Sequence, residues 1–168
     1  MIHDQDFVQE ANNAACEQPS NYHIAITMIE KLDKKLLEVI GNELDRRGYR
    51  QINATQAQLM HKIGNKRLRH SDLHNKGYYL GSNVSYNLKK LARLGLVSQE
   101  TGLTDKRTSE IALTEEGRKI AALVEALYQR QLDFLDKAAG INQEQFSQLN
   151  DTLRRLDRYW TDQVLYQM

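Results

Sequence analysis

The sequence predicts a mainly α-helical fold with one small β-hairpin, and three observations support this prediction. Pro19 is the one proline among 168 residues, so almost nothing interrupts helices along the rest of the chain. Apolar residues recur every three or four positions over several long stretches, whereas one stretch alternates apolar and polar residues. Hydrophobic residues make up 40% of the chain and charged residues 27%, which favours a globular protein over a disordered chain or a membrane protein.

The first 48 residues contain an arm and one long helix. Residues 1–19 are polar and weakly periodic, which predicts an N-terminal arm. From 20 to 47 the apolar side chains step by three or four, the pattern of an amphipathic helix. Gly48 ends this helix, and the basic Arg46 and Arg47 suit its negative C-terminus. The apolar stripe contains Ile29, Leu32, Leu36, Ile40 and Leu44.

Three shorter helices are expected next. The first begins at Asn53 or Thr55, each with a glutamine three residues later as in a capping box, and runs to Ile63. The second covers 71–76, with Ser71 as its cap and Gly77 after it. The third covers 83–94, with Ser82 as its cap and Gly95 after it. Two short helices therefore come before a basic helix.

The alternating stretch and two long helices complete the chain. Residues 96–102 and 108–113 flank a polar loop, which predicts a hairpin. A helix then opens at Thr114 and is broken by Gly140. The last helix starts at Asn142, with Gln145 as its reciprocal cap.

The charges are distributed unevenly along the chain. The net charge is only +1, but the segment from Lys62 to Arg107 holds 10 basic and 3 acidic residues, so it carries +7 and the flanks carry −6. A basic middle between acidic ends is expected where one part of a protein meets phosphate and another meets protein. The alternative is a solvated charged surface without a partner.

The predicted elements follow the order of a winged helix-turn-helix: two helices, a glycine turn, a basic helix and a hairpin with a basic tip. In 83–94 we expect Val84, Leu88, Leu91 and Leu94 to face the core. The outward side would then carry asparagine, which can pair with adenine, and lysine, which can reach guanine or phosphate. The DNA-binding candidates on this helix are Ser82, Asn83, Tyr86, Asn87, Lys89, Lys90 and Arg93.

The hairpin tip supplies three further DNA-binding candidates, Asp105, Lys106 and Arg107. Arg107 is expected to enter a minor groove, with Asp105 orienting it through an ion pair. The competing hypothesis is a winged helix scaffold that binds protein or RNA without operator specificity, because the fold serves all three kinds of partner.

The tip and the residues after it resemble a family signature. Asp105-Lys106-Arg107, followed after five residues by Leu113-Thr114-Glu115-Glu116-Gly117, is similar to the D-x-R-x5-L-T-x-x-G wing signature of MarR-type transcriptional regulators. Residues 84–97 resemble the recognition helix of that family and its exit into the wing. The segments HNKGYYLG and SNVSYN are similar to a subgroup that contains regulators of L,D-transpeptidase genes.

The resemblance implies a dimeric repressor that reads a pseudopalindromic operator in double-stranded DNA. It implies an arm over 1–19 and one MarR-like unit over 20–168. Within that unit, 20–48 and 117–168 would be dimerisation helices and 52–116 the DNA-binding lobe. It also implies a pocket between lobe and dimerisation helices, which a small aromatic or phenolic effector could occupy.

The apolar stripes of the terminal helices independently favour a homodimer. Helices of this length leave apolar surface that one small lobe cannot cover, and a two-fold interface would bury it. The interface candidates are Ile29, Leu32, Phe146, Leu149, Leu153, Leu156 and Trp160.

Other functions find little support in the sequence. It lacks the GxSxG, P-loop, Rossmann and HExxH motifs, so we expect no enzyme. We expect no metal or cofactor, since His70 and His74 have zinc-like spacing but no cysteine nearby. Cys16 has no flanking cation that would activate it as a redox sensor. The chain starts without an apolar leader, and we expect a cytoplasmic protein without membrane contact.

Overall fold

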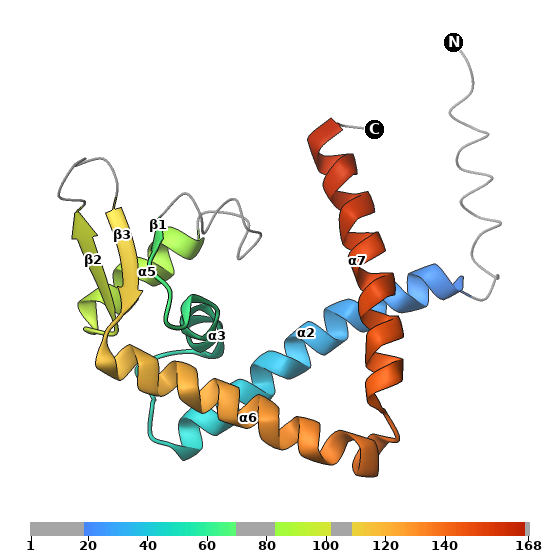
Figure 1. The fold of residues 1–168 in the computed structure, drawn as a ribbon, viewed down its shortest axis with the longest axis horizontal. Helices are drawn as coiled ribbons and strands as arrows, with labels where there is room; N and C mark the ends of the chain where they lie inside the picture. Colours follow the sequence, from blue (N-terminus) through green and yellow to red (C-terminus); the bar gives the residue numbers. More distant parts are fainter. Residues whose placement is uncertain (1–18, 70–82, 102–108, 167–168) are drawn as a thin grey trace, which may run out of the picture. The chain divides into compact units, whose positions relative to one another are not determined.

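The computed structural model describes residues 19–69, 83–101 and 109–166. The chain divides into two units, one ending at Ala54 and the other beginning at Thr55. The mainly helical class with a small antiparallel sheet is confirmed (Figure 1). The elements are α2 (Asn21–Arg46), α3 (Ala54–Ile63), β1 (Leu68–Arg69), α5 (Asn83–Arg93), β2 (Val97–Thr101), β3 (Ser109–Leu113), α6 (Glu115–Ala139) and α7 (Gln143–Tyr166).

Helix α2 starts and ends where the sequence predicts. The Ser20 hydroxyl accepts a hydrogen bond from the His23 amide at 3.4 Å, and Gly48 follows the helix with a left-handed φ of +80°. Arg46 and Arg47 do more than complement the helix terminus, because both pair with the carboxylate of Glu43, which is 2% exposed. The buried glutamate is therefore neutralised within its own helix.

The second unit contains a three-stranded antiparallel sheet in the order β1-β3-β2. Val97 pairs with Leu113 and Thr101 with Ser109, so the predicted hairpin is confirmed. The third strand, β1, was not predicted, since its two residues are too few to show a periodic pattern. It is defined only by its pairing with β3, where Leu68 lies opposite Ile111.

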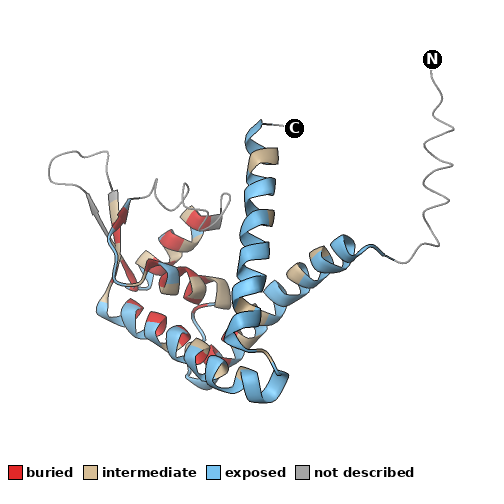
Figure 2. Cartoon of the chain, turned by 45° about the vertical axis from the view of Figure 1, so that its right-hand side comes forward, coloured by how far each residue is buried: buried red, intermediate tan, exposed pale blue. Residues whose placement is uncertain are grey.

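The core of this unit is formed by buried side chains from the sheet and from helices α3, α5 and α6 (Figure 2). Ile111 in β3 is fully buried, and so are residues from the three neighbouring helices. Fully buried side chains of this kind exclude water and hold the helices against the sheet. The most buried members on the helices are Ala57, Leu59, Met60, Ile63, Val84, Leu88, Leu91, Ile120 and Val124.

A tight junction joins the sheet to α6. The hydroxyl of Thr114 accepts from the Gly117 amide at 3.2 Å and donates to the Gly95 carbonyl at 2.7 Å. A Cβ on Gly117 would lie 2.0 Å from the carbonyl oxygen of Leu96, a distance that no side chain can occupy. The Leu-Thr-x-x-Gly part of the signature is thus explained by this junction. The threonine caps α6, and the glycine lets the first turn of α6 lie against the Leu96 carbonyl.

The two long helices of the second unit are capped as predicted. Gly140 ends α6 in the left-handed conformation, with φ +65°. The Asn142 and Gln145 side chains each accept from the other's backbone amide, at 3.0 and 2.9 Å. Only the first half of α6 has buried residues, and α7 has none within the described ranges. No described helix is long and apolar enough to cross a membrane.

Candidate nucleic-acid interface

The inner face of α5 anchors this helix in the core. Val84 is 1% exposed, and Leu88 and Leu91 are fully buried. Leu94 was expected to continue this stripe, which is wrong: it is 39% exposed and lies beyond the last helical residue, Arg93. The chain turns at Gly95, with φ +68°, so the helical spacing no longer determines which way Leu94 faces.

The outer face of α5 is basic and carries one aromatic ring. Tyr86 is 66% exposed, and Lys89 and Arg93 are also exposed, while Lys90 is half-buried. Within the described ranges neither Lys89, Lys90 nor Arg93 forms an ion pair. These side chains are therefore available to an external anion such as a phosphate group.

Asn87 departs from the prediction that it faces away from the core. It is half-buried, and its Oδ1 accepts a hydrogen bond at 3.0 Å from Nε2 of Gln56, which is 1% exposed. The reason is its place on the border between the two faces of α5, where the buried glutamine of α3 needs a polar partner. Asn87 thus connects α5 to α3.

The remaining DNA-binding candidates lie outside what the structure describes. Ser82 and the tip residues Asp105, Lys106 and Arg107 are outside the described ranges, and Asn83 is described only through its backbone in α5. The ion pair expected between Asp105 and Arg107 therefore stays a prediction.

A polar cluster between α3 and α6 was not predicted from the sequence. His61 Nε2 lies 2.7 Å from Glu125 Oε2, and the His61 ring packs edge-on against Tyr128 with centroids 5.1 Å apart. Hydrogen bonds from His61 and Gln129 lower the pKa of the Glu125 carboxyl. Burial raises the pKa of Tyr128. Sequence periodicity could not find this cluster, because its members come from helices far apart in the chain.

The residues expected at a dimer interface are largely solvent-exposed in the single chain. Leu32 is 58% exposed, Leu149 49%, Leu153 37% and Trp160 37%. Ile29, Phe146 and Leu156 are half-buried. Such large apolar side chains in rows along helices are unusual on a monomer's surface.

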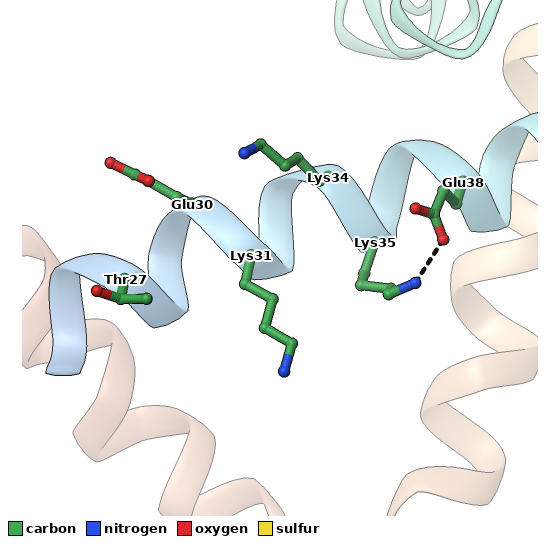
Figure 3. Close-up of a pocket in the computed structure, with 6 residues that line it drawn as sticks. All are labelled: Thr27, Glu30, Lys31, Lys34, Lys35 and Glu38. Carbon is green, nitrogen blue, oxygen red and sulfur yellow. Dashed lines mark hydrogen bonds and ion pairs between the residues drawn. The ribbon is translucent and has the colours of Figure 1, made fainter.

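A metal site and a ligand pocket are two other kinds of functional site. Among the described residues no group of three or more histidine, cysteine, aspartate or glutamate residues is placed to hold a metal ion, and His70, His74 and Cys16 lie outside the described ranges. Figure 3 shows a hollow of about 270 Å³ along α2, where Lys35 and Glu38 form an ion pair at 2.6 Å. The six described lining residues all come from that one helix, so together they form a single wall.

Comparison with known proteins agrees with this geometry. Residues 52–117 match a family model described as a winged helix DNA-binding domain. The chain is 31% identical over 142 residues to the exopolysaccharide II synthesis transcriptional activator ExpG of Rhizobium meliloti strain 1021, covering 83% of this chain and 71% of that protein.

Solved structures share the fold. A MarR family transcriptional regulator from Listeria monocytogenes in complex with a 26mer DNA aligns with a TM-score of 0.69 at 17% identity, covering 84% of this chain and 91% of that one. NadR in complex with 4-hydroxyphenylacetate aligns with a TM-score of 0.63 at 23% identity, covering 83% and 96%. The narrower resemblance to regulators of L,D-transpeptidase genes stays a prediction. With its wing signature, basic outer α5 face and winged helix lobe, the chain belongs to the MarR family of DNA-binding transcriptional regulators.

Proposed function

We propose that the protein acts as a homodimer that reads a pseudopalindromic operator with one α5 helix per half-site. The observation that carries the proposal is the basic outer face of α5, where Lys89, Lys90 and Arg93 follow Tyr86 along the helix without ion pairs in the described part of the chain. Two such helices related by two-fold symmetry would enter successive major grooves about one helical turn apart.

We assign different roles to the side chains of α5. Lys90 lies nearest the core border and reads base edges, while Lys89 and Arg93 contact phosphate. Asn87 positions the helix through Gln56 in addition to any contact with a base. Arg107, at the tip of the wing, reaches a minor groove. As a DNA-binding regulator the protein acts by binding rather than by catalysis, and it does so in the cytoplasm.

The exposed apolar rows on α2 and α7 support the dimer. No residue of α7 that the structure describes is buried in the single chain, although the helix carries Leu149, Leu153 and Trp160 on one stripe. A second copy would remove this surface from water at roughly 25 cal/mol per Å². A symmetric interface requires the same residues from both chains.

We propose repression by occlusion of the promoter as the output. Activation is the second candidate, favoured by the 31% identity to ExpG, which is a transcriptional activator. A reporter gene placed under the operator obtained by selection from random DNA distinguishes the two outputs. In a strain that lacks the gene for this protein, repression predicts higher reporter expression and activation predicts lower expression.

We further propose that a small aromatic or phenolic effector weakens operator binding. NadR, which shares this fold, binds 4-hydroxyphenylacetate in its solved complex. An effector can change operator affinity only by its differential affinity for the free and DNA-bound states. Titration of the protein–operator complex with 4-hydroxyphenylacetate and related phenols tests this, and operator affinity that no phenol alters would contradict it.

Selection of bound duplexes from random DNA, followed by affinity measurements at several salt concentrations, tests the DNA-binding proposal. About four phosphate contacts per subunit predict that log K falls with log salt at a slope of about −7. Lys90→Ala should cost about 1 to 3 kcal/mol on the selected operator and little on random DNA. Arg107→Ala should weaken both more evenly. A flat salt response with no selected motif would favour the protein- or RNA-binding scaffold instead.

A further inference from the structure

One aromatic side chain stands on the outermost line of α5. Tyr86 is two positions from Val84 and two from Leu88, and both of these residues are buried in the core. With about 100° between successive residues of an α-helix, the ring lies on the side of α5 opposite this pair. Leu91 is also fully buried and lies on the same inner side as Val84 and Leu88. The side chain of Tyr86 therefore leaves α5 in the direction that points away from the core of the lobe.

The packing of α5 fixes this direction. Besides the buried stripe, the residue that follows Tyr86 is anchored, because Asn87 Oδ1 accepts a hydrogen bond from Gln56 Nε2 at 3.0 Å. Rotation of α5 about its axis would disrupt both the stripe and this hydrogen bond. The side of the helix that carries Tyr86 is thus set before a partner binds, which lowers the entropic cost of binding.

No described group of the chain engages the ring. Tyr86 is 66% exposed, and within the described ranges it forms no hydrogen bond, ion pair or ring contact. Among the described side chains of α5 it is the one large apolar group that is exposed, since Leu94 lies beyond the last helical residue. Packing within the lobe therefore does not account for an aromatic residue at this position.

The surroundings of the ring suit a nucleic-acid groove. Lys89 and Lys90 follow Tyr86 by three and four residues, so all three side chains share one face of α5. Cations at the edge of a groove contact phosphate, from which a neutral ring gains little. The N-terminal part of a recognition helix is the part that meets base edges, and Tyr86 is the fourth of the eleven residues of α5. In the proposed complex the ring therefore meets the floor of the major groove.

Thymine is the base that matches an aromatic ring at the floor of the groove. Its 5-methyl group is the one apolar group in the pattern by which the major groove distinguishes the four bases. A ring packed on this methyl group removes apolar surface from water on both partners. A base that presents an amino group or a carbonyl at the same place would have that polar group desolvated against the ring, which is unfavourable.

We propose that Tyr86 is a specificity-determining residue whose ring contacts the 5-methyl group of one thymine in each half-site of the operator. The inference rests on the proposed function, because it requires α5 to enter a major groove. It adds that each half-site contains a thymine opposite the first turns of α5, and that the methyl group is what makes thymine the preferred base there. The phenolic hydroxyl is not needed for this contact.

Replacing thymine by uracil in the DNA tests the proposal, because uracil keeps the base pair and lacks the methyl group. The operator selected from random duplexes is synthesised with the replacement at one thymine position at a time, in both half-sites. At one position the affinity of the wild-type protein should fall about 4-fold for each methyl group, or about 15-fold for the two half-sites together. Tyr86→Ala should no longer distinguish thymine from uracil at that position. Fluorescence anisotropy gives the four Kd values, and the double-mutant cycle gives the coupling between ring and methyl group.

Two further variants separate the ring from other causes. Tyr86→Phe keeps the ring and should retain the preference for thymine. Lys89→Ala should weaken binding to both operators alike, so that the ratio of the two Kd values stays that of the wild type. Thermal melts check that Tyr86→Ala is folded, as the exposure of Tyr86 predicts, and Tyr86→Gln replaces it if it is not.

Several results would overturn the proposal. They are the absence of any uracil effect, the same uracil effect in wild type and Tyr86→Ala at every position, loss of the preference in Tyr86→Phe, and operator half-sites without thymine. In each of these cases the protein would still bind a selected operator in a salt-dependent manner. Failure of the proposed function is distinguishable, because then no operator is selected and the salt response is flat, and both proposals would be wrong.

Discussion

Gln56 and Asn87 join the side chains of α3 and α5 through a hydrogen bond of 3.0 Å, donated by Nε2 and accepted by Oδ1. Gln56 is 1% exposed, so this is a core contact rather than a surface one. It couples the orientation of the recognition helix to the helix packed behind it. Asn87, which the sequence analysis assigned to base reading, therefore also helps to hold α5 against α3.

Replacing Gln56 by methionine should impair both folding and DNA binding. The substitution keeps the side-chain length but removes the donor, which leaves the half-buried Asn87 carbonyl with one partner fewer. The free energy of unfolding should fall by about 1 to 3 kcal/mol, and operator affinity should fall with it. Urea denaturation and fluorescence anisotropy measure the two effects. Gln51→Met, at an exposed position, is the control; similar losses in both variants would contradict a specific role for the pair.

Leu153→Glu should convert the protein to a monomer. It places a charge in the centre of the α7 apolar row, where a symmetric interface would bury it twice without a partner, at a cost of several kcal/mol. Sedimentation velocity gives the mass directly, and operator binding should become weak and non-cooperative. Lys89→Ala should weaken DNA binding while leaving the dimer intact. If wild-type protein sediments as a monomer at micromolar concentration, the interface assignment fails.

Gly117→Ala should destabilise the protein although alanine is the better helix former. Its Cβ would collide with the Leu96 carbonyl, which belongs to the backbone and cannot rotate away. The expected loss is about 1 to 3 kcal/mol. Gly41→Ala is the matched control, because nothing lies within 4 Å of the added Cβ in α2, and it should gain about 0.5 to 1 kcal/mol. Thermal melts of the two variants should therefore shift in opposite directions.

The Glu125 carboxylate should make its contribution to stability above pH 4.5 and lose it in acid. Its pKa in the folded chain is lowered from 4.5, chiefly by the hydrogen bond with His61. The unfolded chain therefore binds the proton first as the pH falls, and the contribution disappears as the pH drops through the folded value. The melting temperatures of wild type and Glu125→Gln should differ at pH 6 and converge in acid, once the pH is below the lowered pKa of Glu125 in the folded chain. A constant difference across this range would show that the ionised form has no special role.

The parts of the fold that periodicity and capping chemistry determine could be predicted from the sequence. Thr114 and the Asn142–Gln145 pair cap their helices as expected, and Val97 pairs with Leu113 in the hairpin. These features depend on residues close together in the chain or on a simple alternation.

The features that could not be predicted depend on contacts between distant segments. The hydrogen bond from Gln56 to Asn87 spans 31 residues and the His61–Glu125 contact spans 64. Which side chains meet in such cases is decided by how the helices pack, and neither period nor propensity carries that information. The exposure of Leu94 has a local cause instead, because the glycine after it redirects the chain.

Thr114, which caps α6, also donates a hydrogen bond to the Gly95 carbonyl, just before the first strand of the wing hairpin. The hairpin and α6 are consequently joined directly through Thr114, with no flexible linker between them. A rotation of α6 would therefore move the residues that open the hairpin along with it.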